Sequence, residues 1–228
     1  MRKNYVIIVA GGSGSRMNSD LPKQFLLLAG KPVLMHTIER FTRATSNPKI
    51  IVVLNESLLN YWKILGKEHH FEIPHAVVKG GNSRFQSVKN GLEKIFQLEA
   101  DNLEQVGIAI HDGARPLISP NLIDDCFDAL YEHQATVVAV QSTNSVRIGS
   151  VSESESIDRD SVWMIQTPQT FSAQVLKEAF LQSELASFTD DASVVEKLGY
   201  PIHIIPGDHK NIKITFEDDL KIAQLYLQ

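Results

Sequence analysis

A glycine-rich loop near the N-terminus, Gly11-Gly12-Ser13-Gly14-Ser15, is followed by two positive charges, Arg16 and Lys23. Because such a loop has almost no side chains, its backbone N–H groups can close around an anion. The apolar run 5–10 directly before the loop predicts a buried β-strand. A strand, a bare loop and two cations together predict a phosphate-binding site.

The spacing excludes two common phosphate loops. The string G-x-x-x-x-G-K-[ST] of P-loop proteins does not follow the first strand. The dinucleotide fingerprint requires a third glycine, and Met17 stands at that position. The simpler alternative is a glycine turn that only joins a strand to a helix. Arg16, Lys23 and a second glycine turn, Gly80-Gly81, favour binding over that alternative.

The composition predicts a folded protein that acts on small molecules. With 228 residues, 43% of them hydrophobic, the chain can bury a sizeable core. The net charge of -5 argues against general nucleic-acid binding, so the positive charges used in function must be gathered locally. Neither a signal peptide nor a long apolar run is visible, so we expect a cytoplasmic protein without membrane contact. The single cysteine, Cys126, lies on an apolar helical stripe and is expected in the core.

The elements expected to position these residues alternate between strands and helices. After the first strand, strands are predicted at 50–54, 75–78, 106–110, 135–140, 162–168, 202–205 and 211–214. Helices are predicted in most of the intervals, one of them from 172 to about 185, and at 216–228. This order predicts an α/β fold with a Rossmann-like, doubly wound, mostly parallel sheet. Ligands of such sheets bind beyond the carboxyl ends of the strands, where the first loop, Gly80-Gly81 and Asp112 would meet.

One polar segment, 142–160, departs from this alternation. Its short alternating pieces predict a hairpin arm that protrudes from the sheet, within a single domain that spans residues 1–228. A lone hairpin is only marginally stable in water. We therefore expect the arm to pair with its twin in a homodimer.

Further motifs follow the first loop and its Pro22-Lys23-Gln24 in a fixed order. They are Gly80-Gly81-x-x-Arg84-x-x-Ser87, His111-Asp112-Gly113-Ala114-Arg115-Pro116, Gln166-Thr167-Pro168-Gln169, Thr189-Asp190-Asp191-Ala192-Ser193 and Asn211-Ile212-Lys213-Ile214-Thr215. The first loop resembles that of nucleotidyl transferases that attach a nucleoside monophosphate to a sugar phosphate. Taken together, the motifs resemble the 2-C-methyl-D-erythritol 4-phosphate cytidylyltransferase family over nearly the whole chain.

The resemblance implies a reaction of CTP with methylerythritol phosphate that gives CDP-methylerythritol and pyrophosphate. It implies Mg²⁺ held mainly by the CTP phosphates and water, and we assign no protein ligand to the metal. Family members dimerise through the arm. The implied catalytic residues are Arg16, Lys23 and Lys213. The implied nucleotide-binding residues are Ala10, Gly11, Gly12, Ser13, Gly14, Gly80, Gly81, Ser87 and Asp112. The implied acceptor-binding residues are Asp112, Arg115, Ser145, Arg159, Thr167, Thr189 and Lys213.

The chemistry of such a reaction accounts for these residue types. A phosphate monoester is already nucleophilic at neutral pH, so the enzyme must chiefly align two anions and neutralise their charge. Cations from different motifs should therefore converge. Since no strong base is required, His111 is expected to order its loop. Asp112 could instead be a turn residue, and Asp190 and Asp191 could be helix caps only.

The acceptor is the least determined part of this interpretation. Where the family usually has an acid, this chain has Asn144, followed by Ser145. Ribitol 5-phosphate, the acceptor of the related pentitol-phosphate cytidylyltransferases, is therefore the alternative to methylerythritol phosphate. Two further hypotheses are a nucleotidyl transferase that uses GTP or UTP and a non-catalytic nucleotide sensor. The sensor would not need Arg16, Lys23 and Lys213, which are all present.

Overall fold

The first strand, β1 (Lys3–Val9), is rich in apolar residues and is buried on both of its faces. Tyr5 and Ile7 pack on one side of the sheet, and Val6 and Ile8 pack on the other. A strand covered on both faces is typical of the centre of a parallel sheet. The remaining strands of this sheet are β4 (Lys49–Leu54), β5 (Ala76–Lys79), β6 (Val106–Asp112), β7 (Ala135–Gln141), β10 (Trp163–Ser172) and β11 (His203–Pro206).

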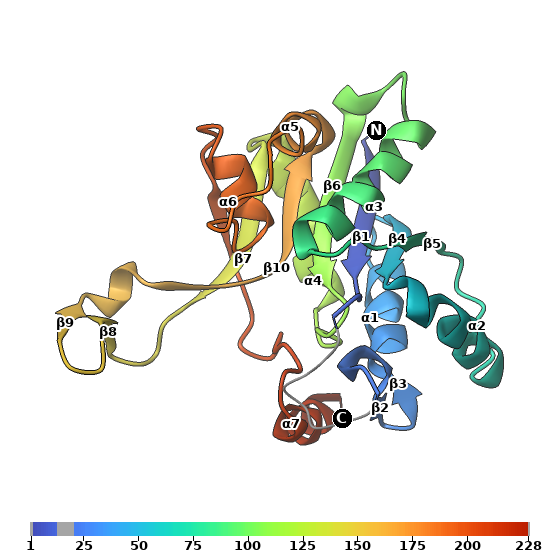
Figure 1. Ribbon diagram of the computed structural model, residues 1–228, viewed down its shortest axis with the longest axis horizontal. Coiled ribbons are helices and arrows are strands. Elements are labelled where there is room, and N and C mark those ends of the chain that lie inside the picture. The colour runs from blue at the N-terminus through green and yellow to red at the C-terminus, as the bar shows by residue number, and fades with distance from the viewer. Residues whose placement is uncertain (1, 13–20, 228) are drawn as a thin grey trace.

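The computed structural model describes residues 2–12 and 21–227, and within them these strands form a seven-stranded sheet in the order β11-β7-β10-β6-β1-β4-β5 (Figure 1). Strand β10 is antiparallel to its neighbours β6 and β7, and the other neighbouring pairs are parallel. The predicted α/β fold with a mostly parallel sheet is confirmed.

Helices cover both faces of the sheet. One face carries α3 (Arg84–Leu98), α5 (Ala173–Ala179) and α6 (Asp191–Glu196), and the other carries α1 (Val33–Thr42), α2 (Leu59–Glu68) and α4 (Pro120–Asp128). Cys126 of α4 is buried in the core, as predicted. The C-terminal helix α7 (Glu217–Leu227) packs near the short strands β2 (Leu27–Leu28) and β3 (Lys31–Pro32). No helix in the described part of the chain is long and apolar enough to cross a membrane.

Side-chain caps begin several of these helices. Ser83 Oγ accepts a hydrogen bond from the backbone N–H of Gln86 at the start of α3, and Ser119 caps α4 in the same way. Asp190 caps α6 and forms a capping box with Ser193. The N-cap role considered for Asp190 is therefore present in the structure.

Two details of the predicted secondary structure are wrong. Helix α5 ends at Ala179 rather than near residue 185, because the chain that follows is mostly exposed and has no apolar face to bury. The segment 211–214 is not a strand. Its backbone instead packs on the loop after β6, where the N–H of Ile214 donates to the carbonyl of Ala114. The alternation of apolar and polar residues predicted a strand here. A segment that packs on a loop can bury the same apolar residues, so the pattern does not distinguish the two cases.

The polar segment between β7 and β10 forms a hairpin of β8 (Val146–Gly149) and β9 (Ser154–Ile157). Figure 1 shows this arm projecting far beyond the sheet, on the side away from β5. Large apolar side chains on the arm and at the start of β10 are exposed, among them Ile148, Val151 and Met164.

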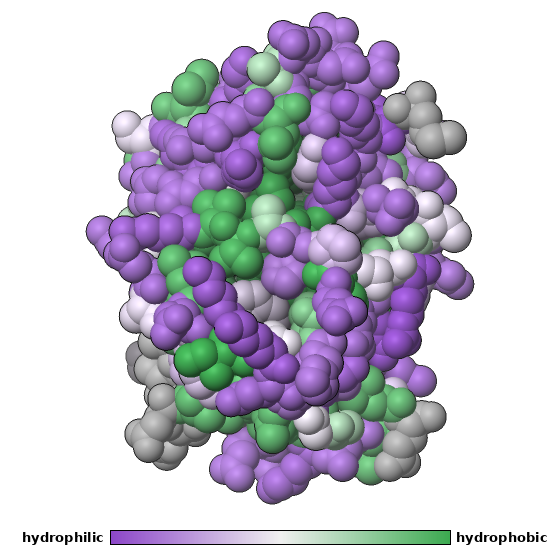
Figure 2. All heavy atoms as spheres, turned by 90° about the vertical axis from the view of Figure 1, so that its right-hand side faces the viewer, coloured by the Kyte–Doolittle hydropathy of each residue, from purple (hydrophilic) through white to green (hydrophobic). Residues whose placement is uncertain are grey.

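The opposite side of the molecule carries α2 and the edge strand β5. Figure 2 shows this side, where apolar side chains gather in the middle and hydrophilic ones surround them. A groove here is lined partly by Trp62, Phe71 and Val77. Most of the exposed lining of this groove is apolar, and Lys63, Lys67 and His70 also contribute to it.

Candidate active site

The main polar pocket lies at the carboxyl ends of β1, β4, β5 and β6. The chain leaves β1 toward β4 and β5 and then returns to β6 on the other side of β1. Ligands of open α/β sheets bind where the strand order reverses in this way. We call this pocket the first lobe, and its walls include Ala10, Gly11, Gly12, Lys23, Gly81, Ser87, Asp112 and Lys213.

A second hollow, the second lobe, adjoins the first. Its walls include Arg115, Gln166, Thr167, Gln169, Thr189 and Asp190. Arg84, Asp112 and Lys213 line both lobes. These side chains therefore stand where the contents of one lobe would meet the contents of the other.

The beginning of the glycine loop is held by Gln24. This buried amide donates from Nε2 to the carbonyl of Ala10 at 2.6 Å and to that of Gly12 at 3.3 Å. Because Gln24 occupies both carbonyls, the loop does not present them unsatisfied to an anion. The predicted residues Ser13, Gly14 and Arg16 lie outside the described residues.

Ser87 closes the second glycine turn, since its Oγ accepts a hydrogen bond from the N–H of Gly81 at 3.1 Å. A Cβ added to Gly81 would lie 2.0 Å from Cγ of Gln86, so no larger residue fits there without displacing that side chain. The N–H of Gly80 donates to the carbonyl of Leu54, which fixes the turn to the end of β4. Gly81 also lines the first lobe, where a residue without a side chain lets a ligand approach the backbone.

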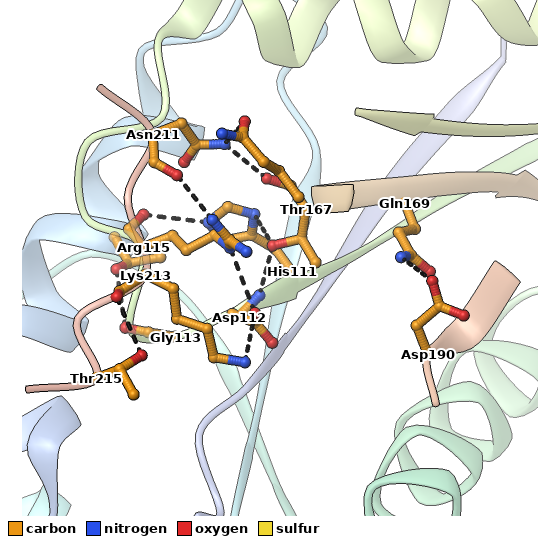
Figure 3. A network of polar contacts seen from close by, with 12 residues as sticks. His111, Asp112, Gly113, Arg115, Thr167, Gln169, Asp190, Asn211, Lys213 and Thr215 are labelled. Carbon is orange, nitrogen blue, oxygen red and sulfur yellow. Dashed lines mark hydrogen bonds and ion pairs between the residues drawn. The ribbon is translucent and has the colours of Figure 1, made fainter. Parts of the chain in front are cut away.

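The carboxylate of Asp112 is the electrostatic centre of the site (Figure 3). Its Oδ1 accepts from Arg84 Nη1 at 2.9 Å, and its Oδ2 lies 3.0 Å from Lys213 Nζ and 3.4 Å from Arg115 Nε. Burial by itself would raise the pKa of Asp112, but Arg84, Lys213 and Arg115 hold this pKa well below its usual range. Asp112 is thus an ionised counter-ion shared by three cations.

A chain of hydrogen bonds fixes the backbone beside Asp112. The N–H of Asp112 donates to Thr167 Oγ1 at 3.0 Å, and this hydroxyl lies 3.0 Å from His111 Nδ1. His111 Nε2 is 3.2 Å from the carbonyl of Arg115, to which it must donate. His111 Nδ1 is then the acceptor from Thr167. Burial lowers the pKa of His111 to about 4, which keeps the ring neutral as this pattern requires. His111 orders its loop, as predicted.

The second lobe is supported from behind by buried amides. Gln169 donates to Asp190 Oδ2 at 2.8 Å and accepts from the N–H of Ala192, which ties β10 to the start of α6 (Figure 3). Asn211 donates to the carbonyl of Thr167 at 2.9 Å, and its own carbonyl accepts from Arg115 Nη1 at 2.7 Å. The Lys213 segment is therefore anchored on the same loops that carry Asp112 and Thr167.

Two predicted acceptor residues do not lie with the others. Ser145 and Arg159 belong to the arm, are exposed, and line neither lobe. The ion pair recorded for Arg159 is with its neighbour Asp160, at 3.8 Å. Within one chain, the structure brings together the predicted residues at the carboxyl ends of the strands. The predicted residues of the arm lie apart from them.

The donor set fits a metal that arrives with a ligand better than one held by the protein. In residues 2–12 and 21–227, no group of three or more His, Cys, Asp or Glu side chains converges on a common point. Asp112 lines both lobes, but both of its oxygens already face cations. Mg²⁺ usually retains waters and binds phosphate oxygens, so such an ion would take most of its ligands from outside the protein.

Several residues of the site were not predicted as functional. Gln24 takes part through hydrogen bonds to the nearby glycine loop, and Arg84 and Asp191 take part through contacts between segments further apart in the sequence. Arg84 lies at a fixed place in the second glycine motif, and this position could have indicated a functional residue. Its carboxylate partners could not be read from that motif.

Comparisons with known proteins agree over the length of the chain. The model of the 2-C-methyl-D-erythritol 4-phosphate cytidylyltransferase family matches residues 4–228. A relative of that name from Bacteroides thetaiotaomicron is 44% identical over 225 residues, covering 99% of this chain and 100% of the relative. One from Bacillus licheniformis is 38% identical, covering 99% of this chain and 96% of the relative. The crystal structure of 4-diphosphocytidyl-2C-methyl-D-erythritol synthase from Anaerococcus prevotii superposes with a TM-score of 0.82 at 28% identity, covering 100% of this chain and 96% of that one.

Proposed function

Because this chain belongs to the 2-C-methyl-D-erythritol 4-phosphate cytidylyltransferase family, we propose that its first lobe binds CTP and its second lobe binds the phosphate acceptor. The enzyme transfers CMP from CTP to 2-C-methyl-D-erythritol 4-phosphate and releases pyrophosphate. The observation that carries the proposed placement is the wall of Arg84, Asp112 and Lys213 between two adjoining lobes. A transfer reaction requires that two substrates meet at such a boundary.

The nucleotide is placed by two glycine segments. Cytosine lies against the turn of Gly80 and Gly81, where backbone groups can read its exocyclic amine, and Ser87 keeps the turn closed. The triphosphate lies along the backbone that begins at Ala10, with Lys23 on the same wall of the lobe. Arg16, which follows this loop in sequence, is proposed to add a second cation.

The chemical step needs alignment and charge neutralisation rather than a base. The acceptor phosphate attacks the α-phosphorus of CTP, and the bond from that phosphorus to the leaving pyrophosphate breaks. Lys213 stands between the lobes and can meet the oxygens of the α-phosphate, where charge is redistributed during transfer. His111 is buried and both of its ring nitrogens are engaged, by Thr167 and by the carbonyl of Arg115, so we assign it no role as a base.

Mg²⁺ is proposed as the metal of the reaction, held by CTP phosphates and water, with Asp112 as the carboxylate nearest to them. When bound, the ion neutralises phosphate charge and thereby favours departure of pyrophosphate. The same proposal places the enzyme in the cytoplasm, where nucleoside triphosphates are available.

The acceptor is held in the second lobe by Arg115, Thr167 and Thr189. Ser145 and Arg159 are remote from this lobe in their own chain, so they reach an acceptor only if another copy supplies them. We therefore propose a homodimer in which each arm lies over the partner's second lobe. The exposed apolar side chains Ile148, Val151 and Met164 would be buried in such a dimer.

Pyrophosphate release tests the function directly, with CTP, UTP, ATP and GTP each combined with methylerythritol phosphate or ribitol 5-phosphate. We expect CTP with methylerythritol phosphate to give the highest kcat/KM, as the family match favours this acceptor over the pentitol. A higher kcat/KM for ribitol 5-phosphate at saturating CTP would overturn the acceptor. Equal use of CTP and UTP would overturn the placement of cytosine at the glycine turn.

A further inference from the structure

Arg84 bridges two carboxylates that come from different parts of the fold. Its Nη1 lies 2.9 Å from Asp112 Oδ1, and its Nη2 lies 2.5 Å from Asp191 Oδ2. The side chains of Asp112 and Asp191 are 9% and 2% exposed, so both charges are nearly removed from water. A planar guanidinium can serve two carboxylates at once, whereas the single ammonium of a lysine cannot do so in the same geometry.

This bridge joins three elements at the edge of the site. Arg84 is the first residue of α3, Asp112 ends β6, and Asp191 is the first residue of α6. The two helices lie on the same face of the sheet. Asp191 thus gives Arg84 a second anchor, and this anchor is independent of the loop that follows β6.

The two oxygens of Asp112 have separate partners. Arg84 occupies Oδ1, and this leaves Oδ2 to Lys213 and Arg115. If Arg84 released Oδ1, the carboxylate could turn about its own bond to the backbone and draw Lys213 back from the boundary of the lobes. Arg84 and Lys213 thus share the Asp112 carboxylate without a hydrogen bond or ion pair between themselves, so Arg84 could influence the position of Lys213 through Asp112.

We propose that Arg84 is a positioning residue for cytidylyl transfer, which uses Asp191 as its anchor to fix the Asp112 carboxylate and thereby holds Lys213 between the two lobes. The inference rests on the roles proposed above for Asp112 and Lys213. It differs from direct substrate binding, in which Arg84 would act on a ligand of the two lobes through N–H groups that the two carboxylates do not use. Asp191 makes no hydrogen bond or ion pair with Asp112 or Lys213, and it acts on them only through Arg84.

The test begins with Arg84→Lys, which keeps a positive charge between the two carboxylates, and circular dichroism at the assay temperature first checks that the variant is folded. We expect kcat to fall by about tenfold to a hundredfold, since small misplacements at a reacting centre have effects of this size. KM for CTP should stay within about threefold, because Gly81, Ser87 and Lys23 are unaltered. Ile95→Val, a core change in the same helix, serves as the control for lost stability. It should lower Tm and leave kcat unchanged, so that a loss of stability by itself would not account for a slower reaction.

A double-mutant cycle then separates positioning from direct contact. Asp191→Asn alone should also lower kcat, but in the Arg84→Lys background it should have almost no further effect, because its only proposed route is through Arg84. Independent, additive losses would overturn the anchor role of Asp191. A kcat for Arg84→Lys within about threefold of the parent would overturn the inference as a whole. Parent turnover is measured first, and its absence would contradict the proposed function instead.

Discussion

Lys213, which lies near the C-terminal end of the chain, reaches Asp112 at the end of β6, with its Nζ 3.0 Å from Asp112 Oδ2. The lysine side chain is 39% exposed, whereas the carboxylate is 9% exposed. The buried partner therefore holds a mobile, partly hydrated cation at one place. This arrangement keeps Lys213 at the boundary of the two lobes without removing it from the pocket, so a phosphate that enters can still bind it.

Replacement of the pocket lysines should lower turnover without unfolding the protein. For Lys23→Ala and Lys213→Ala we expect kcat to fall by about a hundredfold or more, as when a group that stabilises transition-state charge is removed. Lys213→Ala should also raise KM for the acceptor. Rapid-quench measurement of a single turnover reports this step directly. Lys221→Ala, which breaks a surface pair with Asp218, is the matched control and should be neutral. A single-turnover rate within a few-fold of the parent for Lys23→Ala would contradict its role.

The second glycine turn should be intolerant of a side chain. In Gly81→Ala the new Cβ would meet the side chain of Gln86 at 2.0 Å, so the turn must shift and KM for CTP should rise by about tenfold or more. Gly66→Ala is the control, because a Cβ at this helical position meets nothing within 4 Å. Steady-state kinetics with CTP and UTP would compare the variants. An unchanged KM and an unchanged preference for CTP in Gly81→Ala would exclude the turn from base recognition.

His111 should make the protein less stable in mild acid. The unfolded chain binds a proton at this residue near pH 6.5, whereas burial lowers the pKa in the folded protein to about 4. Below pH 6.5 the unfolded state therefore binds more protons, so stability falls as the pH drops toward 4, by up to about 3 kcal/mol, and the loss disappears above pH 6.5.

Urea unfolding of the parent and of His111→Asn at several pH values would test this linkage. The variant should be less stable at pH 7.5, because hydrogen bonds of the ring are lost, but its stability should depend less on pH. His209→Asn, at an exposed position, is the matched control. Parallel slopes for the parent and His111→Asn would show that another group is responsible.

The proposed dimer predicts complementation between two inactive variants. If Arg159 acts in the partner's pocket, a mixed dimer of Lys213→Ala and Arg159→Ala contains one pocket with both residues intact. Random exchange of subunits should then restore about a quarter of the parent activity. Each variant alone, taken through the same exchange procedure, is the control. If Arg159 acts within its own chain, no pocket in the mixed dimer is intact, and activity would stay at the level of the separate variants.

The sequence by itself determined the fold class and the chemical character of the site. Short β-branched runs between amphipathic helices specify a mostly parallel sheet, because both faces of such strands must be covered. Strands end where apolar residues give way to glycine or acid, so the positions of Gly11, Gly81 and Asp112 at one edge followed from local pattern alone. Ser83 and Ser119 were predictable as caps for the same local reason.

The tertiary structure decided which charged groups act together. The pairing of Arg84 with Asp112 and Asp191 depends on the strand order, which places the start of two helices beside the end of β6. The segment of Lys213 resembled a strand because alternating burial has the same pattern whether a chain packs on a sheet or on a loop. The separation of Arg159 from the pocket was likewise invisible in the sequence. Local pattern reports which side chains are buried, whereas the distances between distant segments are set by how the whole sheet is wound.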